Sequence, residues 1–364
     1  MFREPPLLFH PAGRTLPHCL RERESHDKQS TEKRRAKGVD TSRYGYFFIA
    51  PFFLIYLVFQ AYPLLNTIYL AFQKYMITGT NKVIGPTFVG LANFKNVLVK
   101  GSTLQAFENT AVMWLINFIP QILLALLLAK WFTDTRLKIR GQGAFKVMIY
   151  MPNIITAASI SVLFYSLFAY PQGPVNSLLA QLGVIDKTLY ADSGTAALTA
   201  IYFLEKGWHT RLIIAFINFW MWYGHTMIVL IAGMLGISPS LFEAAEVDGA
   251  SPNQIFTKIT LPLLKPILLY TLITSLIGGM QMYDIPQMMQ MQGSPAKTMT
   301  MTVTMYIMEL VYTGTKDYGR GAAVSVLLFL VTAVLSIILF YIMRDKDAAR
   351  ERKAQKKARK EARA

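Results

Sequence analysis

Six long apolar runs constrain this 364-residue chain more than any other feature of its sequence. Each run approaches the ~20 residues that a helix needs to cross the hydrocarbon core of a bilayer. Apolar residues make up 53% of the chain and charged residues 16%, which is typical of a membrane protein rather than of several soluble domains. We therefore predict an all-α, polytopic integral membrane protein with six transmembrane helices. The predicted spans are 46–70, 109–129, 145–169, 212–235, 262–282 and 322–343.

Positive charges are distributed unevenly between the two sides of these spans. Of the 37 Lys and Arg residues, 27 fall in the two terminal segments, in the loops after the second and fourth spans, or in the first few residues of the spans that follow these loops. Because cytoplasmic segments carry the excess of Lys and Arg, both termini are predicted to be cytoplasmic. The net charge of +16 is concentrated in these segments, so it indicates attraction to membrane lipids and not nucleic-acid binding.

The terminal segments are polar. Residues 1–43 form a leader without an apolar h-region, so we expect no cleavable signal peptide and expect the first span to direct insertion. The lone Cys19 excludes an internal disulfide and a thiolate metal cluster. Residues 344–364 alternate basic residues with Ala. This tail either forms a helix on anionic lipid or is a solvated charge run that enforces topology.

Ionisable residues are nearly absent from the middle of the spans, where only His225 is found. Proton- or cation-coupled transporters usually place such residues at membrane depth, so the energy for any transport is expected from another subunit. The chain has no phosphate-binding loop of its own, since the nearest pattern, Ala296-Lys297-Thr298, lacks both glycines. An intramembrane enzyme would need clustered His, Asp or Glu, which the spans do not contain. We predict neither a catalytic residue nor a cofactor or metal.

The loop between the fourth and fifth spans, residues 236–262, carries a distinctive pattern. Glu243-Ala244-Ala245 is followed after three residues by Gly249, and after nine more by an Ile-Thr-Leu-Pro sequence. A capping box of Ser240 with Glu243 is expected to begin one short helix, and Ser251 with Pro252 a second. Gly249 permits the sharp reversal between them. The two alanines keep one face of the loop slim enough to enter a groove on a partner. The alternative is that Glu243 only caps its helix and Gly249 only ends it.

This spacing resembles the loop by which permease subunits of ATP-binding-cassette importers engage their ATPase. Further segments resemble the carbohydrate permeases of this class, and most closely the maltose-permease-like branch, over residues 44–343. One difference is Ser294, where the family usually has Gly. The matching segments are Phe88-Val89-Gly90-Leu91-Ala92-Asn93-Phe94, Asn109-Thr110, Met151-Pro152, Gly173-Pro174-Val175-Asn176-Ser177-Leu178-Leu179, Gly293-Ser294-Pro295, Asp317-Tyr318-Gly319 and Ala322-Ala323.

The resemblance implies a type I importer permease in a bacterial inner membrane, with a six-helix permease domain at residues 44–343 that forms half of a translocation pore. It implies a second related permease, two ATPase subunits and an extracytoplasmic solute-binding protein as partners, and a carbohydrate as the solute. It also implies that the ATPase-coupling residues are Glu243, Ala244, Ala245 and Gly249. An oligosaccharide is the expected solute. A solute such as glycerol phosphate is the alternative.

Two helical stripes could line a path for that solute. Asn218, Trp222 and His225 share one face of the fourth span, and Met280 and Tyr283 share one face of the fifth. Amide, imidazole and aromatic groups suit sugar hydroxyls and C–H faces, and the maltose-type permeases take their sugar contacts from these helices. Neither stripe contains Arg or Lys, which disfavours a phosphate. The alternative is that Trp222 and Met280 only pack, and that Asn218 and His225 only bond between helices.

The fifth span ends in a methionine-rich run, residues 281–291. Thioether sulfur favours Cu(I), but the run contains no His or Cys. We therefore predict apolar packing for these methionines and no metal site.

Overall fold

The computed structural model describes residues 42–99, 101–134, 136–137, 139–185, 200–291, 293, 296–344 and 361. The predicted leader up to residue 41, Cys19 included, and the predicted tail beyond residue 344, apart from Glu361, lie outside the described residues. The chain consists of two compact units, Met1–Pro63 and Leu64–Ala364.

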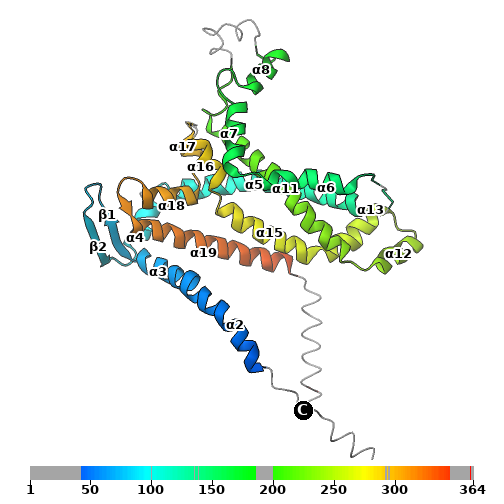
Figure 1. Cartoon of the computed structure of the whole chain (residues 1–364), viewed down its shortest axis with the longest axis horizontal. Coiled ribbons are helices and arrows are strands. Elements are labelled where there is room, and N and C mark those ends of the chain that lie inside the picture. Colours follow the sequence, from blue (N-terminus) through cyan, green and yellow to red (C-terminus); the bar gives the residue numbers. More distant parts are fainter. Residues whose placement is uncertain are drawn as a thin grey trace, which may run out of the picture. The chain divides into compact units, whose positions relative to one another are not determined.

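Five helices are long and apolar enough to cross a membrane, among the described residues. The first, Tyr44–Ala71, contains a π-helical turn, and the one at Lys265–Met291 is interrupted by a short turn after Met280, whereas the other three are unbroken α-helices. Five of the six predicted spans therefore correspond to helices of spanning length, as coloured in Figure 1. Their elements are α2 (Ser42–Tyr56), η1 (Leu57–Ala61) and α3 (Tyr62–Ala71), then α5 (Thr103–Thr133), α11 (Gly207–Leu235), α15 (Lys265–Met280) and α19 (Tyr318–Met343).

The predicted third span is not one straight helix. α6 (Gln142–Tyr150) and the 3₁₀ turn η2 (Met151–Ile154) meet α7 (Ala157–Leu167) at an angle of 90°. Pro152, buried in η2, cannot donate a backbone hydrogen bond, and Ile155 and Thr156, which follow η2, are extended. Thr156 then caps the new helix by accepting a hydrogen bond from Ser159 N at 3.3 Å. A bent pair of helices therefore occupies the place of the predicted third span.

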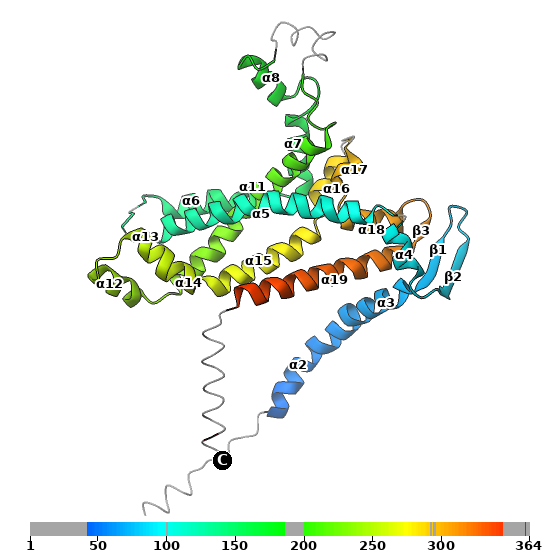
Figure 2. The same ribbon diagram turned by 180° about the vertical axis from the view of Figure 1, so that it is seen from behind.

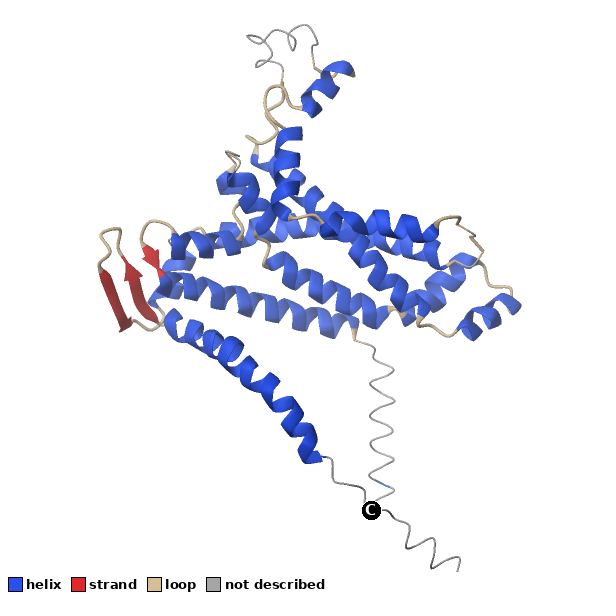
Figure 3. Cartoon of the chain, viewed as in Figure 1, coloured by secondary structure: helices blue, strands red, loops and turns tan. Residues whose placement is uncertain are grey.

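A small sheet, which was not predicted, accompanies the helices (Figure 3). β1 (Gln73–Ile77) pairs antiparallel with β2 (Val83–Phe88) on one side and β3 (Lys316–Asp317) on the other. The Asn93 carboxamide on α4 (Ala92–Val99) donates to Ala71 O at 2.9 Å and to Gln73 O at 2.7 Å. The end of the first span is thereby fixed to the start of the sheet.

α5 and α11 run side by side and form the centre of the larger unit (Figures 1 and 2). At one end of this pair, a buried arginine joins three segments. The Arg211 guanidinium on α11 donates to the Asn109 carboxamide on α5 and, at 2.6 Å, to the carbonyl of Met299 on α17 (Lys297–Thr300). Asn109 in turn donates to Thr298 O and Met301 O, both at 3.0 Å. No carboxylate lies within ion-pair distance of Arg211 in the described part of the chain.

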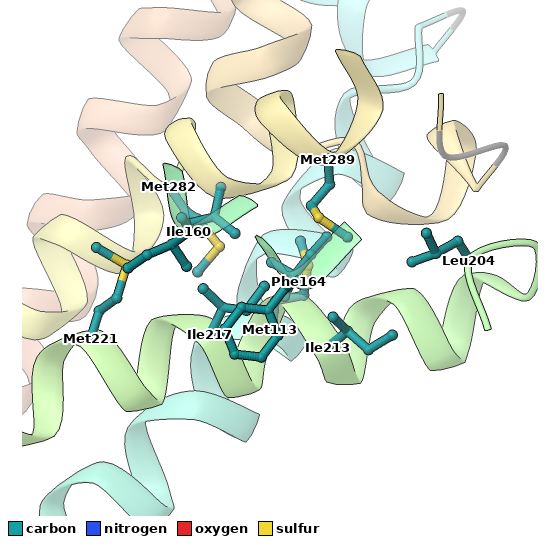
Figure 4. Close-up of a cluster of buried hydrophobic side chains, with 11 residues drawn as sticks. Met113, Ile160, Phe164, Leu204, Ile213, Ile217, Met221, Met282 and Met289 are labelled. Carbon is teal, nitrogen blue, oxygen red and sulfur yellow. The ribbon is translucent and has the colours of Figure 1, made fainter. Parts of the chain in front are cut away.

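The principal hydrophobic cluster lies where α5, α7 and α11 meet α16 (Asp284–Met291) (Figure 4). Met113 of α5 and Ile217 of α11 are fully buried there. Met282 and Met289, from the methionine-rich run, belong to the same cluster and are 7% and 0% exposed. The prediction of apolar packing is confirmed for these two residues. Two further helices among the described residues are α8 (Pro174–Gln181) and α18 (Val303–Tyr312).

Candidate solute cavity and coupling loop

A cavity of about 340 Å³ lies between α5, α11, α15, the first residue of α7 and the start of α16. Four of the five predicted solute-site residues line it: Asn218, Trp222, His225 and Tyr283. The structure thus brings together side chains from the fourth span and from the segment after the fifth. The volume falls within the usual range of small-molecule sites.

The α11 wall presents the predicted stripe. Trp222 is 47% exposed, and its ring meets the His225 imidazole edge-on with the centroids 5.8 Å apart. Asn218 donates to Ile214 O at 2.9 Å, one turn back on its own helix. His225 makes no hydrogen bond to another helix in the described structure, and its contact with α6 is a tilted ring contact with Tyr150, with the centroids 6.4 Å apart. The stripe therefore presents an aromatic face, an imidazole and an amide oxygen to the cavity.

Met280 does not line this cavity. It is 2% exposed and packs, with Leu276 of the same α15 face, against Val303 of α18 and Val324 of α19. The face of α15 that lines the cavity instead carries hydroxyl groups, at Thr271, Thr274 and Ser275 among others. The structure therefore does not bring Met280 together with the other four predicted residues, because Met280 is buried in the cluster with residues of α18 and α19. Tyr283 reaches the cavity because α15 ends at Met280 and the chain turns there.

Two polar residues of α5 were missed from the sequence. Asn117 and Gln121 lie one turn apart on α5 and line the cavity, although both are about 95% buried, with exposed fractions of 6% and 5%. Gln121 donates to Thr226 Oγ1 at 2.7 Å, whereas the Asn117 carboxamide has no hydrogen-bond partner in the described structure. Two amides at a spacing of four in an otherwise apolar span were the signal that could have revealed them.

Close helix contact shapes the floor of the cavity. Trp114 of α5 donates to Ser275 Oγ at 3.2 Å, and its indole lies against Gly279 of α15. A Cβ atom at Gly279 would come within 2.0 Å of Trp114 Cδ1. Gly278, one residue earlier, lines the cavity and has no atom within 4 Å of the corresponding position. The glycine pair therefore combines one tight contact with one open position.

The loop at 236–262 forms two short helices, as predicted. These are α12 (Pro239–Val247) and α13 (Pro252–Ile255), followed by the π-helical turn η3 (Phe256–Thr260) and α14 (Leu261–Leu263). Gly249 has φ +77°, which favours glycine, and Gly249 N and Ala250 N donate to Glu246 O and Ala245 O. This is a Schellman motif, so Gly249 both ends α12 and reverses the chain.

The predicted capping box at Ser240 is wrong. α12 begins with Pro239 at its first position, so Ser238 is its N-cap residue and Ser240 already lies inside the helix. The capping box occurs instead at the second helix. There Gln254 N donates to Ser251 Oγ at 3.4 Å, and Ser251 N donates to Gln254 Oε1 at 2.8 Å.

The acidic residues of α12 have different surroundings. Glu246 accepts a hydrogen bond from Arg136 at 2.8 Å, whereas the exposed Glu243 has no hydrogen bond or ion pair in the described structure. Glu243 therefore does not cap α12. Ala244 is exposed, but Ala245 is 8% exposed, so only one of the two alanines is on the accessible face.

A bundle of membrane-spanning helices around a polar cavity, with a projecting helix pair between two spans, has the architecture of a membrane permease. The family model for the inner membrane component of binding-protein-dependent transport systems matches residues 110–346. The chain belongs to this family. It is therefore a multi-pass membrane component of a transport system and not an enzyme.

Relatives and solved structures agree with this assignment. The chain is 32% identical over 310 residues to the lactose transport system permease protein of Rhizobium radiobacter, covering 85% of this chain and 95% of the relative. It is 29% identical to the arabinooligosaccharides transport system permease protein of Bacillus subtilis, over 80% and 86% of the two chains. A bacterial ABC transporter involved in the import of alginate shares the fold, with a TM-score of 0.65, 23% identity and coverage of 84% and 97%.

Proposed function

We propose that this chain is a permease subunit of an ATP-driven importer of carbohydrates, in the range of oligosaccharides, and forms half of the translocation pore. The observation that carries the proposal is the cavity lining. Amide, hydroxyl and aromatic groups from α5, α11 and α15 converge there, and no Lys or Arg side chain is among them. Such a lining suits sugar hydroxyls and C–H faces, and disfavours glycerol phosphate.

The same proposal assigns the energy source to separate subunits. Glu243, in the middle of α12, carries an exposed carboxylate without a partner in the described structure, and the turn after α12 depends on Gly249. This supports a docking role toward an ATPase for Glu243, Ala244 and Gly249. Ala245 is buried, so we assign it a packing role within the coupling loop.

The partners and orientation follow from the family and the charge distribution. A second related permease completes the pore, two ATPase subunits bind the loops at 236–262, and a solute-binding protein delivers the sugar on the opposite side. The excess of Lys and Arg places both termini and the coupling loop in the cytoplasm of a bacterial cell. The name of the family supports the binding-protein partner.

Uptake and ATP hydrolysis measured together test the proposal. Trp222→Ala removes a stacking surface, and Asn218→Ala removes an amide, each worth about 1 kcal/mol, so uptake at subsaturating sugar falls about fivefold. ATP hydrolysis stimulated by the loaded binding protein persists, because the coupling loop is untouched. Met280→Leu is the matched control, since Met280 packs away from the cavity. Unchanged uptake in both cavity variants at normal expression would place the solute path elsewhere.

A further inference from the structure

Among the residues that line the cavity, Asp284 is the single one with a formal charge. The proposed function assigns it no role. Asp284 is the first residue of α16 and is exposed where the chain turns from the end of α15. Its carboxylate has no hydrogen bond or ion pair in the described structure. The remaining titratable groups of the lining are His225, Tyr270 and Tyr283.

The surrounding wall presents uncharged polar groups to a solute and contains no Lys or Arg side chain that could neutralise the Asp284 carboxylate. Asn117 is nine-tenths buried, lines the cavity and lacks a protein partner, so its carboxamide is available to a solute. The polar groups of Thr274, Ser275 and Gln281 are uncharged. The field that an entering solute meets from this subunit is therefore dominated by one negative charge.

We infer that Asp284 determines the charge class of the solute: it excludes anionic saccharides such as uronates and sugar phosphates, and admits neutral ones. This rests on the proposed carbohydrate function. Two like charges about 6 Å apart in a partly solvated cavity repel enough to weaken binding about tenfold. A neutral sugar does not experience this repulsion and can donate a hydroxyl hydrogen bond to the carboxylate.

Matched neutral and anionic probes test this inference. The purified transporter complex, in lipid nanodiscs and without its solute-binding protein, is first offered lactose, maltotriose and arabinotriose. The sugar that binds best is then converted to its alditol by reduction and to its aldonic acid by oxidation. These two derivatives share an open-chain end and differ in charge, so the ratio of their dissociation constants in equilibrium dialysis isolates the charge effect.

Wild-type complex is expected to bind the aldonate about tenfold more weakly than the alditol. Asp284→Asn brings the two constants to within about twofold, while alditol binding changes less than threefold. Asp284→Glu retains the difference, and an ionic strength of about 1 M, with a Debye length of about 3 Å, diminishes it. Glu205→Gln is the matched control, because it removes an equal charge from an exposed residue outside the cavity and leaves the difference intact.

Two outcomes overturn the inference: an undiminished difference in Asp284→Asn, or an equal loss of both derivatives. The first means that the charge of Asp284 does not act on the solute, and the second that Asp284 holds the cavity together. Failure of the carbohydrate function gives a separate result. In that case none of the neutral probes binds, or alditol binding does not respond to Asn218→Ala and Trp222→Ala.

Discussion

The coupling loop and the solute cavity are built in opposite ways. The loop is contiguous in sequence, and its turn is held by backbone bonds between residues at most five positions apart, such as Ala250 N to Ala245 O. The cavity takes its lining from five helices, and two of its amides, Asn117 and Asn218, are about a hundred residues apart. A local structure of this kind can be recognised from residue spacing alone. An assembled wall depends on which helix faces pack against one another.

The largest effect is expected from reversing the charge at Glu243. Glu243→Lys lowers ATP-driven uptake about 30-fold or more, because removal of a partner from a buried interfacial charge pair costs about 2–5 kcal/mol. Glu246→Gln is the matched control on α12. Its ion pair with Arg136 is about half exposed and contributes less than about 1 kcal/mol. Uptake per copy of membrane-inserted protein is the measurement, and equal losses in both variants would refute a special role for Glu243.

The glycine pair at the cavity floor should give the next largest effect. Gly279→Ala forces a methyl group into the Trp114 indole and is expected to destabilise the protein by about 1–3 kcal/mol. Gly278→Ala, one residue earlier, meets no atom and slightly favours the helix. Thermal unfolding midpoints in detergent compare the two variants. A midpoint for Gly279→Ala no lower than that for Gly278→Ala would contradict the tight contact.

A substitution at Gly249, where the coupling loop reverses direction, tests whether local backbone conformation determines the structure of this loop. Gly249→Ala costs about 1–2 kcal/mol because φ is +77° there, although the space around the position is open. Gly249→Asn costs less, since Asn tolerates this backbone region. Hydrogen exchange at the Gly249 and Ala250 amides reports the loss of the turn. Equal exchange in the Ala and Asn variants would show that conformation does not limit this position.

The smallest effect concerns Asn117, one of the two cavity residues on α5 that were not predicted from the sequence. Asn117→Ala removes an unpaired amide from the cavity and is expected to weaken sugar binding about fivefold, or about 1 kcal/mol. Gln105→Ala, at an exposed position on the same helix, leaves binding unchanged. Equilibrium dialysis with the sugar measures both. Full affinity in Asn117→Ala would remove α5 from the solute path.

The sequence was informative wherever one helix or turn determines the outcome. The spacing of Asn218, Trp222 and His225 predicts their shared face, and the glycine at 249 predicts the reversal of the loop. Met280 was misplaced because periodicity defines stripes on a helix but not the neighbour that each stripe meets. The capping box was misplaced because a serine precedes both Pro239 and Pro252, but only Ser251 is followed three residues later by a side chain, that of Gln254, which can bond back to the N-cap backbone. A proline indicates where a helix can bend but not by how much, and the 90° bend after Pro152 lies in a segment that contacts α11.

The hydrogen bonds of Arg211 and Asn109 imply an order in which parts of the protein complete their folding during synthesis. Its members come from α5, α11 and α17, and the Met299 carbonyl is 88 residues beyond the arginine. A chain emerges from the ribosome with its N-terminal part first, so the guanidinium and the Asn109 carboxamide are made long before the carbonyls that complete their bonds. Until residues 298–301 arrive, this end of the bundle lacks its final hydrogen bonds. The completed fold of the α5 and α11 pair is therefore a late event in the synthesis of the protein.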